Sequence, residues 1–549
     1  DPTNPTLTTR SGIFVAGSAS GPRDISESVV TGLAAAIQAI RYASPGVIEE
    51  EKYEETIEPY PIRVGVFVCH CGTNIAGVAD VPALVEAAKQ MPDVVHAEDL
   101  QFACAKSSLD RITEVIKEKK LNRVVVASCS PVTHLRFFQD AAKRAGLNPY
   151  LVEMTNIRNL DTWVHNDRKV ATEKAKDMIR MAVAKVHHMV PLQTIKLPVI
   201  KRALVVGCGP AGLAAATGLA GAGIETILVE KADECGGMLR RLNRLEPEGI
   251  EARKLLDRMV EEAREVGVKF MLGTTIKDVS GFTGNFHVVL SNGVELDVGA
   301  IIVATGAKPY IPTEFNYGKD PRVLTTLDLE NGKTVDGKNV AIINCVGSRT
   351  SGRGCSKYCC AVGLSKAIEL RNQGKNVVLI YRDIMGVDPE VEDLYKKARD
   401  AGVLFIRIPR KAELTEAIKM DSDKLIVHDV ELGDDVEIPF DNIVLNIGLV
   451  PSEDTDEVSK ILRLSKDQEG FLMEAHPKLG PVDTMTPGIF IAGAARGPKN
   501  VAEAIAEGYA AASRALMMLA QGYVTKEPFI PKFDWSKCTK CGLCIKACP

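Results

Sequence analysis

Fourteen cysteines give this 549-residue sequence its clearest chemistry. The four nearest the C-terminus are Cys538, Cys541, Cys544 and Cys548. Their C-x2-C-x2-C-x3-C-P spacing is that of bacterial ferredoxins and predicts [4Fe–4S] ligation. In two-cluster ferredoxins the fourth cysteine serves the other cluster, so Cys548 ligates either a neighbouring cluster or, if this run acts alone, the same one. Zinc is the alternative, although zinc motifs usually place more residues between two C-x2-C pairs.

A dinucleotide-binding fingerprint follows an expected strand at 203–206. It reads Gly207-Cys208-Gly209-Pro210-Ala211-Gly212 and opens an expected helix at 213–222. The first glycine turns the chain, the second lets a pyrophosphate approach the backbone, and the third allows close helix packing. Glu230, followed by Lys231, ends the next expected strand, where a carboxylate accepts hydrogen bonds from an adenosine ribose. A glycine turn without a ligand is the alternative.

Three further segments resemble the FAD-contacting segments of thioredoxin-reductase-like flavoproteins. They are Gly236-Gly237-Met238, Ala304-Thr305-Gly306 and the strand that ends at Gly493-Ala494, with Val501 shortly after it. These flavoproteins normally carry Asp after the last glycine, so we expect Ala494 to change the contacts to the ribityl chain. Together the three segments favour FAD as the dinucleotide.

A second nucleotide-binding loop is expected after the strand 339–344, but the G-x-G-x-x-G/A pattern is missing there. The segment carries four thiols instead, at Cys345, Cys355, Cys359 and Cys360. We interpret them as ligands of one [4Fe–4S] cluster, because four thiolates are the usual requirement. Buried or free cysteines and a redox-active disulfide are the alternatives.

Four more cysteines fall in a region, 61–188, where apolar strands alternate with helical periodicity. This alternation predicts a small α/β domain. The cysteines lie at or near its expected strand ends, at Cys69, Cys71, Cys104 and Cys129. In a reducing compartment close thiols favour metal ligation over disulfides. Here, however, a redox or structural role fits the sequence as well as ligation does.

An internal repeat joins the two ends of the chain. Residues 12–23 read GIFVAGSASGPR, and residues 488–499 read GIFIAGAARGPK. An Ala-rich amphipathic helix follows each copy. The sequence therefore opens with the tail of one flavin domain and then contains a second module that is almost complete.

Several unusual motifs resemble those of the A-type subunits of heterodisulfide reductase. They are CVGSR at 345–349 with the cysteines after it, YRDI at 381–384, VFVCHCG at 66–72, ASCSP at 127–131 and NIR at 156–158. The resemblance covers about residues 60–549, and the repeat implies a tandem fusion of which this is the second copy plus the tail of the first. Because the last motif stops at half a ferredoxin, we expect a segment of a longer polypeptide.

The resemblance implies an FAD where two-electron chemistry meets one-electron clusters and, in full complexes, flavin-based electron bifurcation. In that family the cysteines matching Cys345, Cys355, Cys359 and Cys360 hold a cluster, and a lysine near the flavin corresponds most nearly to Lys366. The archetypal family member also has a ferredoxin insert before the Ala304 strand. Residues 238–300 contain no cysteine, so this FAD either bifurcates by another route or only relays electrons.

The expected fold is α/β, with a thioredoxin-reductase-like FAD domain between a small α/β domain and a ferredoxin-like C-terminus. The expected parts are 1–45 (tail of a preceding flavin domain), 60–190 (small α/β domain), 200–335 with 475–520 (FAD domain), 336–474 (second Rossmann-like domain with the Fe–S loop) and 530–549 (start of a ferredoxin domain).

Charged residues make up 25% of the chain and the net charge is −4, which argues against a nucleic-acid partner. No apolar run reaches the roughly 20 residues of a membrane span, and we expect a cytoplasmic protein. The expected function is electron transfer between FAD and [4Fe–4S] clusters within a larger complex. Its partners would be the other subunits, a hydrogenase or formate dehydrogenase module, and ferredoxin. An NAD(P)H-dependent flavin reductase and an inert scaffold for redox subunits are the competing hypotheses.

Overall fold

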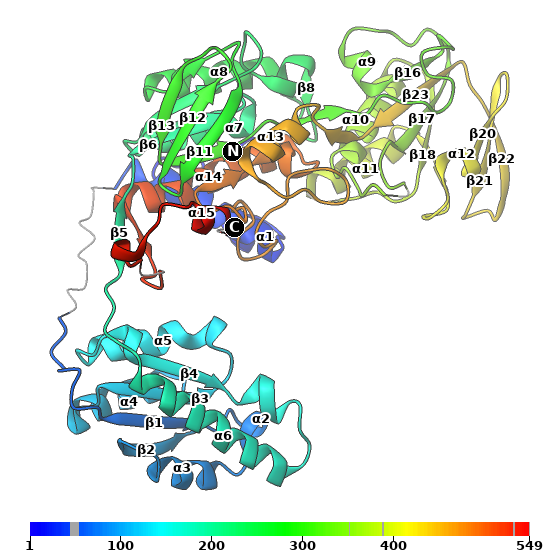
Figure 1. Cartoon of the computed structure of the whole chain (residues 1–549). Coiled ribbons are helices and arrows are strands. Elements are labelled where there is room, and N and C mark those ends of the chain that lie inside the picture. Colours follow the sequence, from blue (N-terminus) through cyan, green and yellow to red (C-terminus); the bar gives the residue numbers. More distant parts are fainter. Residues whose placement is uncertain (44–53, 351, 387–388, 531–532, 548–549) are drawn as a thin grey trace. The chain divides into compact units, whose positions relative to one another are not determined.

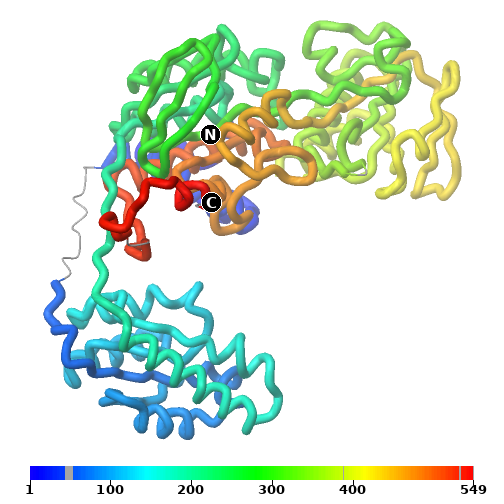
Figure 2. The backbone as a smooth tube through the Cα atoms, viewed as in Figure 1, coloured from blue at the N-terminus to red at the C-terminus, as the bar shows by residue number. Residues whose placement is uncertain are grey.

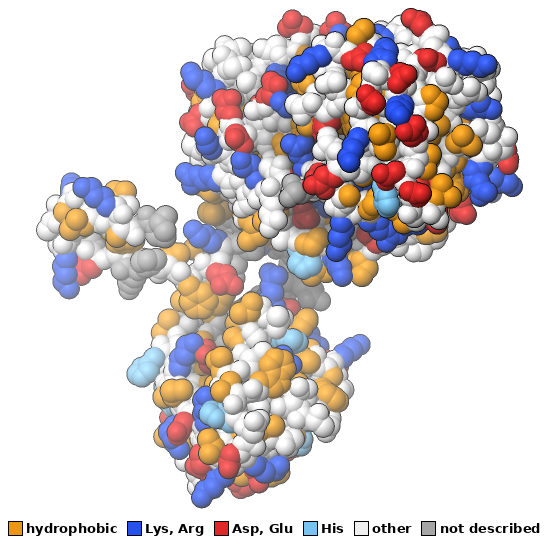
Figure 3. Space-filling view, turned by 90° about the vertical axis from the view of Figure 1, so that its right-hand side faces the viewer, with side chains coloured by type: hydrophobic (Ala, Val, Ile, Leu, Met, Phe, Trp, Pro, Cys, Tyr) orange, Lys and Arg blue, Asp and Glu red, His pale blue; other side chains and the backbone are white. Residues whose placement is uncertain are grey.

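The computed structural model describes residues 1–43, 54–350, 352–386, 389–530 and 533–547. The chain divides into two compact units (Figures 1 and 2). The first unit combines Asp1–Pro45 with Lys196–Thr525, and the second combines Gly46–Ile195 with Lys526–Pro549. Among the described residues, no helix is long and apolar enough to cross a membrane. On the face in Figure 3, acidic and basic side chains are interspersed over the larger body.

The first unit contains a parallel five-stranded sheet in the order β10-β7-β6-β14-β25. Its strands are β10 (Lys269–Met271), β7 (Glu225–Val229), β6 (Arg202–Val206), β14 (Ala300–Val303) and β25 (Ile489–Ile491). The central strands are continuous apolar runs because both faces of the sheet are covered. Between β10 and β14 the chain forms an antiparallel meander of β11 (Ile276–Phe282), β12 (Asn285–Leu290) and β13 (Glu295–Val298).

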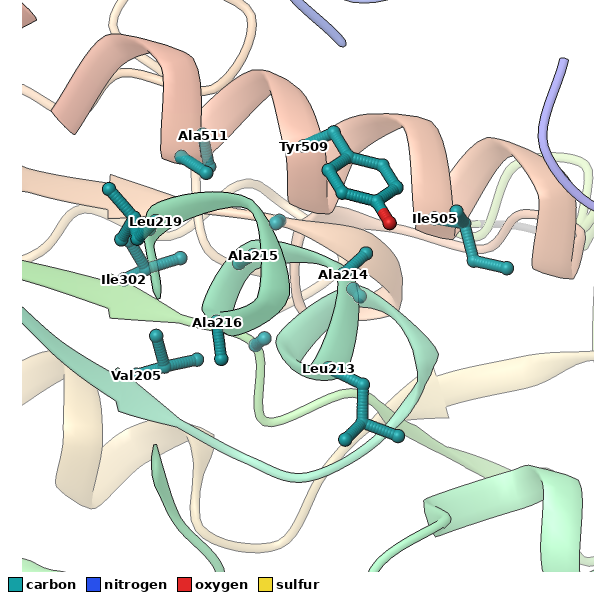
Figure 4. Packing of buried hydrophobic residues seen from close by; sticks show 14 of the residues in the cluster. Val205, Leu213, Ala214, Ala215, Ala216, Leu219, Ile302, Ile505, Tyr509 and Ala511 are labelled. Atoms are coloured by element: carbon teal, nitrogen blue, oxygen red, sulfur yellow. The ribbon is translucent and has the colours of Figure 1, made fainter. Parts of the chain in front are cut away.

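Helix α7 (Pro210–Gly221) packs between this sheet and α14 (Val501–Gln521), as Figure 4 shows. Small residues on α7 let the two helices approach closely. A Cβ on Gly508 of α14 would lie 2.2 Å from the carbonyl oxygen of Ala211. The N-terminus of α7 is therefore fixed by the core of the domain.

A second parallel sheet, in the order β16-β23-β17-β18-β19, repeats this plan. Its strands are β16 (Val323–Thr325), β23 (Asn442–Ile447), β17 (Asn339–Val346), β18 (Asn376–Tyr381) and β19 (Leu404–Arg407). Its meander is β20 (Ile418–Met420), β21 (Lys424–Asp429) and β22 (Asp434–Pro439). Helices α10 (Cys359–Asn372) and α11 (Pro389–Asp400) pack on the parallel sheet. Strand β17 runs two residues beyond the end expected from the sequence, so Cys345 lies inside it.

The internal repeat is also a structural repeat. The backbone N–H of Gly17 donates to Thr31 Oγ1 over 2.9 Å, and the N–H of the matching Gly493 donates to Glu507 Oε2 over the same distance. Helices α1 (Ile25–Ile40) and α14 both begin with a capping box, at Asp24 and at the matching Asn500. The two helices pack against each other within the first unit.

The second unit contains a parallel sheet in the order β2-β1-β3-β4. The strands are β2 (Val94–Leu100), β1 (Val64–Cys69), β3 (Arg123–Ser128) and β4 (Val152–Asn156). The helices that accompany them are α3 (Val81–Lys89), α4 (Lys106–Lys119), α5 (Pro131–Arg144) and α6 (Arg168–His187).

Candidate functional site

One cavity of about 1240 Å³ dominates the first unit. Such a volume exceeds the roughly 300–1,000 Å³ of most small-molecule sites. Thirteen of the sixteen residues expected to bind the cofactor line it, namely Gly207, Gly209, Pro210, Ala211, Glu230, Lys231, Gly237, Met238, Ala304, Thr305, Gly306, Ala494 and Val501. The structure therefore gathers segments that are up to about 300 residues apart in the sequence.

The other three predicted residues, Gly212, Gly236 and Gly493, are not among the residues that line the cavity and lie in the backbone next to it. A Cβ on Gly212 would lie 1.8 Å from the carbonyl oxygen of Gly207, and a Cβ on Gly493 would lie 2.6 Å from the Cβ of Ala211. Gly236 has φ +130°, a conformation that side chains disfavour. These glycines permit close backbone approach and do not face a ligand.

The phosphate end of the cavity fits FAD. Gly209 precedes the first residue of α7, and the space where its Cβ would be is open, with no atom within 4 Å. Backbone N–H groups at such a helix start favour a pyrophosphate. Glu230 accepts hydrogen bonds from the backbone N–H groups of Cys208 (2.7 Å) and Ala232 (3.0 Å), which fix its carboxylate at the cavity wall. Lys231 pairs with Asp454 at 3.0 Å.

Thr305 also points to a ligand. Its Oγ1 is buried and has no hydrogen-bond partner among the described residues, although Thr305 lines the cavity. A buried hydroxyl without a partner is unfavourable, and a bound polar group would satisfy it.

A buried charge network beside Ala494 was not predicted from the sequence. Glu507 pairs with Arg496 and, at 3.2 Å, with Lys499, and Arg496 also approaches Glu474 at 3.4 Å. Burial lowers the pKa of Lys499. The signal that could have found this network is the Gly-Pro-Lys sequence, which recurs as Gly-Pro-Arg in the N-terminal copy.

The four thiols at the end of β17 and in the segment that follows it belong to the wall of the same cavity and to the core behind that wall. Cys355 lines the cavity, whereas Cys345, Cys359 and Cys360 are buried. Burial raises the pKa of Cys345 to about 12. A hydrogen bond from Cys359 lowers the pKa of Cys360 to about 7, and the Met385 N–H also donates to the Cys360 sulfur over 3.5 Å. Ligation as thiolates would remove the cost of ionising the buried thiols.

Two cations lie near these thiols, the buried Arg382 and the half-buried Arg349. Arg382 is only 1% exposed and donates through Nη1 to the carbonyl oxygens of Pro409 and Arg410. Its Nε and Nη2, and Nη1 of Arg349, have no partner among the described residues. Arg349 also pairs with Asp383 at 2.8 Å. Guanidinium N–H groups left free beside four thiols fit an anionic cluster that would accept from them.

In the described part of the chain, no three His, Cys, Asp or Glu side chains are arranged to hold a single metal ion. In a [4Fe–4S] cluster each thiolate binds a different iron, so the four sulfurs need not meet at one point. These four thiols therefore do not form a mononuclear site in the described part of the chain, and their ligation of a cluster stays a prediction.

Lys366, expected near the flavin, is not among the residues that line the cavity. Its ammonium pairs with Glu330 at 2.7 Å and with Glu369 at 2.9 Å. Glu330 does line the cavity, so Lys366 lies one residue behind its wall.

The C-terminal thiols Cys538, Cys541 and Cys544 are exposed, and the short helix α15 (Leu543–Ala547) carries the third of them. Cys548 lies outside the described residues. A backbone hydrogen bond from Leu543 lowers the pKa of Cys541.

The four cysteines of the second unit lie at or shortly after the C-terminal ends of its parallel strands. Cys69 and Cys129 lie at the ends of β1 and β3, the Ala103 N–H donates to the Cys69 sulfur over 3.3 Å, and Arg158 donates to the Cys71 sulfur over 3.5 Å. Burial raises the pKa values of Cys69 and Cys129, and the charges of Cys71 and Cys104 act on both thiols. The sequence left their roles open, and the structure adds only that the four thiols are near enough to affect one another's pKa values.

Cys208 and Cys235 form a disulfide, with Cα atoms 4.9 Å apart. No role was predicted for these two cysteines from the sequence, because the expectation of ligation concerned only closely spaced cysteines and these two are 27 residues apart. The two residues lie in separate loops, and only the fold of the FAD domain brings these loops together.

Comparisons with known proteins agree with this geometry. The profile of the family described as "Pyridine nucleotide-disulphide oxidoreductase" matches residues 201–508, and that described as "4Fe-4S binding domain" matches residues 531–549. The protein is therefore a flavin- and iron–sulfur-dependent oxidoreductase with a thioredoxin-reductase-like fold. Its cofactors are FAD and [4Fe–4S] clusters.

Relatives narrow the class further. The chain is 35% identical to the A-type subunit of the H(2):CoB-CoM heterodisulfide,ferredoxin reductase of Methanothermobacter thermautotrophicus, covering 91% of each chain. It is 36% identical to an A-type iron-sulfur subunit of the CoB–CoM heterodisulfide reductase of Methanopyrus kandleri, covering 89% of this chain and 90% of that one. The chain belongs to the family of heterodisulfide reductase A-type subunits, as the sequence motifs predicted. Lactococcus lactis thioredoxin reductase is 22% identical, with a TM-score of 0.43 over 59% of this chain and 100% of that chain.

Proposed function

We propose that this oxidoreductase subunit carries electrons between FAD in the large cavity and a [4Fe–4S] cluster on Cys345, Cys355, Cys359 and Cys360. One observation carries the proposal: Cys355 and the phosphate-loop residue Gly209 line the same cavity. A ligand that extends from the phosphate loop toward Cys355 would lie next to the thiol loop without an intervening domain.

The second Rossmann-like half offers little room for a pyridine nucleotide, despite the name of the matched family. A Cβ on Gly347, which follows β17, would lie 2.1 Å from a ring carbon of Tyr310, so this turn is filled. Helix α10, whose start would otherwise receive a pyrophosphate, begins at Cys359-Cys360. This argues against the NAD(P)H-dependent flavin reductase.

FAD, when bound, exchanges electrons in pairs or singly, whereas a [4Fe–4S] cluster accepts them one at a time. The chain supplies placement and charge. Glu230 would hold the adenosine end, and the guanidinium groups of Arg349 and Arg382 favour negative charge at the thiol loop.

We further propose that this FAD relays electrons and does not itself bifurcate. Residues 238–300 contain no cysteine, so they offer no second iron–sulfur exit beside the flavin. Bifurcation would then belong to another flavin of the complex.

We propose a multi-subunit complex as the setting. The names of relatives link their complexes to H(2), to ferredoxin or to F(420)H(2). By this analogy the partners are the heterodisulfide-reducing subunits, ferredoxin and a hydrogenase or formate dehydrogenase module. The three described ferredoxin-type thiols are exposed, which suits exchange with such a partner.

The test is a Cys359→Ser variant, reconstituted without oxygen together with the native chain. We expect the variant to lose one cluster's iron and sulfide and the corresponding EPR signal while it keeps its FAD. Cys235→Ser is the control for iron content alone and should keep its full iron content. Full iron content in Cys359→Ser, or rapid bleaching of the flavin by NADPH, would overturn the proposal. Flavin and clusters that fail to equilibrate after dithionite would favour an inert scaffold.

A further inference from the structure

We propose that Cys208 and Cys235 form a redox-modification site for small thiols and disulfides, and that its oxidation state controls how tightly FAD is held. The Cα atoms are 4.9 Å apart, within the range of about 4.4–6.8 Å that an S–S bond spans. The site is separate from the cysteines assigned to clusters. It concerns retention of FAD, not the direction of electron flow.

The bond joins two walls of the FAD cavity. Cys208 lies between Gly207 and Gly209 of the phosphate loop, and Cys235 directly precedes Gly236. The Gly236 N–H donates to the Cys208 carbonyl oxygen over 2.8 Å, so a backbone hydrogen bond accompanies the covalent one.

The residues next to the two cysteines face the cofactor space. Gly209 and Gly237 both line the cavity, and a Cβ on Gly237 would lie 3.5 Å from the Cα of Gly209. The Cys208 N–H donates to Glu230, the carboxylate expected at the ribose. The disulfide therefore fixes the phosphate loop, the ribose carboxylate and the Gly236-Gly237 turn as one rigid wall.

The two cysteines differ in how exposed they are. Cys208 is fully buried, whereas Cys235 is half-buried and follows the exposed Glu234. A thiolate from solvent would attack the Cys235 sulfur, because attack needs access to the sulfur. Cys208 would be the leaving group.

The exchange balances in two steps. The small thiolate bonds to Cys235 Sγ, the Cys208–Cys235 bond breaks, and the Cys208 thiolate takes up a proton. A second small thiolate then attacks the mixed disulfide, which releases the small disulfide and leaves Cys235 as a thiol. Two electrons and two protons pass from two small thiols to the pair, and a small disulfide reverses the reaction.

Opening the pair should loosen the cofactor. Once the S–S bond is broken, the two sulfur atoms move apart to van der Waals distance, and the loops that carry Gly209 and Gly237 lose the covalent link between them. If these loops must become ordered each time FAD binds, that ordering lowers the affinity for FAD. We expect about tenfold weaker FAD binding in the reduced state, which corresponds to about 1.4 kcal/mol.

The experiment uses the full chain with its clusters, handled without oxygen, after incubation with reduced glutathione or with glutathione disulfide. Alkylation and peptide mass spectrometry report the state of Cys208 and Cys235, and ultrafiltration with flavin fluorescence reports the dissociation constant of FAD. We expect a linked Cys208–Cys235 peptide and tight FAD after glutathione disulfide. Free thiols and weaker FAD should follow reduced glutathione.

The Cys235→Ser variant is the control, because its half-buried side chain tolerates the change and leaves Cys208 without a partner. Its FAD affinity should match that of the reduced native chain and should not respond to glutathione. Two alkylated cysteines after glutathione disulfide, or equal FAD affinity in the two states, would overturn the proposal. Neither result would bear on the cluster ligands, which the Cys359→Ser variant tests separately.

Discussion

The backbone N–H of Gly493 donates a hydrogen bond to the carboxylate of Glu507 over 2.9 Å. The same carboxylate compensates the buried cations Arg496 and Lys499. In the N-terminal repeat the matching acceptor is the neutral Thr31. The C-terminal copy therefore differs from the N-terminal copy by the anion Glu507 in place of Thr31 and by one further cation, Arg496 in place of Ser20, on the same backbone geometry.

Replacing Glu507 by Ala should destabilise the first unit by about 3–5 kcal/mol, because it removes the carboxylate that pairs with Lys499 and leaves Arg496 with Glu474 alone. Glu507→Gln keeps an acceptor for the Gly493 N–H but removes the charge, so it separates the two contributions. Thermal unfolding followed by circular dichroism gives the difference. An Ala variant as stable as the native chain would show that the network contributes nothing to folding.

Glu230→Gln should weaken FAD binding by about tenfold or more, because hydrogen bonds to a charged group contribute about 1.5–3 kcal/mol. The change keeps the shape of the side chain, but the amide NH2 of Gln cannot accept, so one of the two hydrogen bonds from the Cys208 and Ala232 N–H groups is also lost. Glu234→Gln is the control, since this exposed carboxylate pairs with Arg240 at the surface. Equilibrium titration of the flavin-free chain with FAD measures both. Equal losses in the two variants would argue against a ribose contact at Glu230.

Glu246 makes the stability of the first unit depend on pH. Burial raises the pKa of this cavity-lining carboxyl above its ordinary value of 4.5. The folded chain therefore holds this proton more tightly than the unfolded chain, and ionisation at neutral pH costs stability. As the pH falls through the raised pKa the lost stability returns, and below the ordinary value no further gain follows.

Glu246→Gln should flatten this pH dependence and raise the unfolding temperature at neutral pH. Glu251→Gln, at an exposed carboxylate paired with Lys254, should leave the profile unchanged. Unfolding temperatures measured from mildly alkaline to mildly acidic pH supply the comparison. A Glu246→Gln profile with the native slope would assign the dependence to other groups.

Most residues that the sequence patterns selected for FAD lie together, because those patterns are short and local. A glycine turn after a strand, an Ala-Thr-Gly strand end and a final Gly-Ala strand each carry their own signal. Thirteen of the sixteen residues chosen on these patterns line one cavity. The exceptions, such as Gly212, are glycines that the backbone needs for close packing, and a sequence pattern does not separate that role from ligand contact.

Features that depend on long-range packing could not be predicted in the same way. Nothing in the sequence indicates that Arg382 is buried with free N–H groups near Cys345. Lys366 was the nearest match to the lysine of the family, but its ion pairs with Glu330 and Glu369 keep it outside the cavity lining. Cys208 and Cys235 become neighbours only when two loops of the FAD domain meet. The one available hint was a cysteine between two fingerprint glycines.

The close crossing of α7 and α14 yields the last prediction. A Cβ on Gly508 would lie 2.2 Å from the carbonyl oxygen of Ala211, and backbone cannot yield as a flexible side chain can. Gly508→Ala should therefore push α14 away from α7 and cost about 1–3 kcal/mol or more. It should also lower the FAD content per chain, because Ala211 lies in the first turn of the helix that follows the phosphate loop.

The repeat provides a matched control for this variant. Gly32 occupies the same place in α1, but the space around its Cβ position is open. Gly32→Ala should be neutral or should stabilise the chain by up to about 1 kcal/mol, because Ala favours a helix more than Gly does. Unfolding temperature and bound FAD measured for both variants decide the matter. If Gly508→Ala behaves like Gly32→Ala, the spacing of these two helices does not fix the phosphate loop.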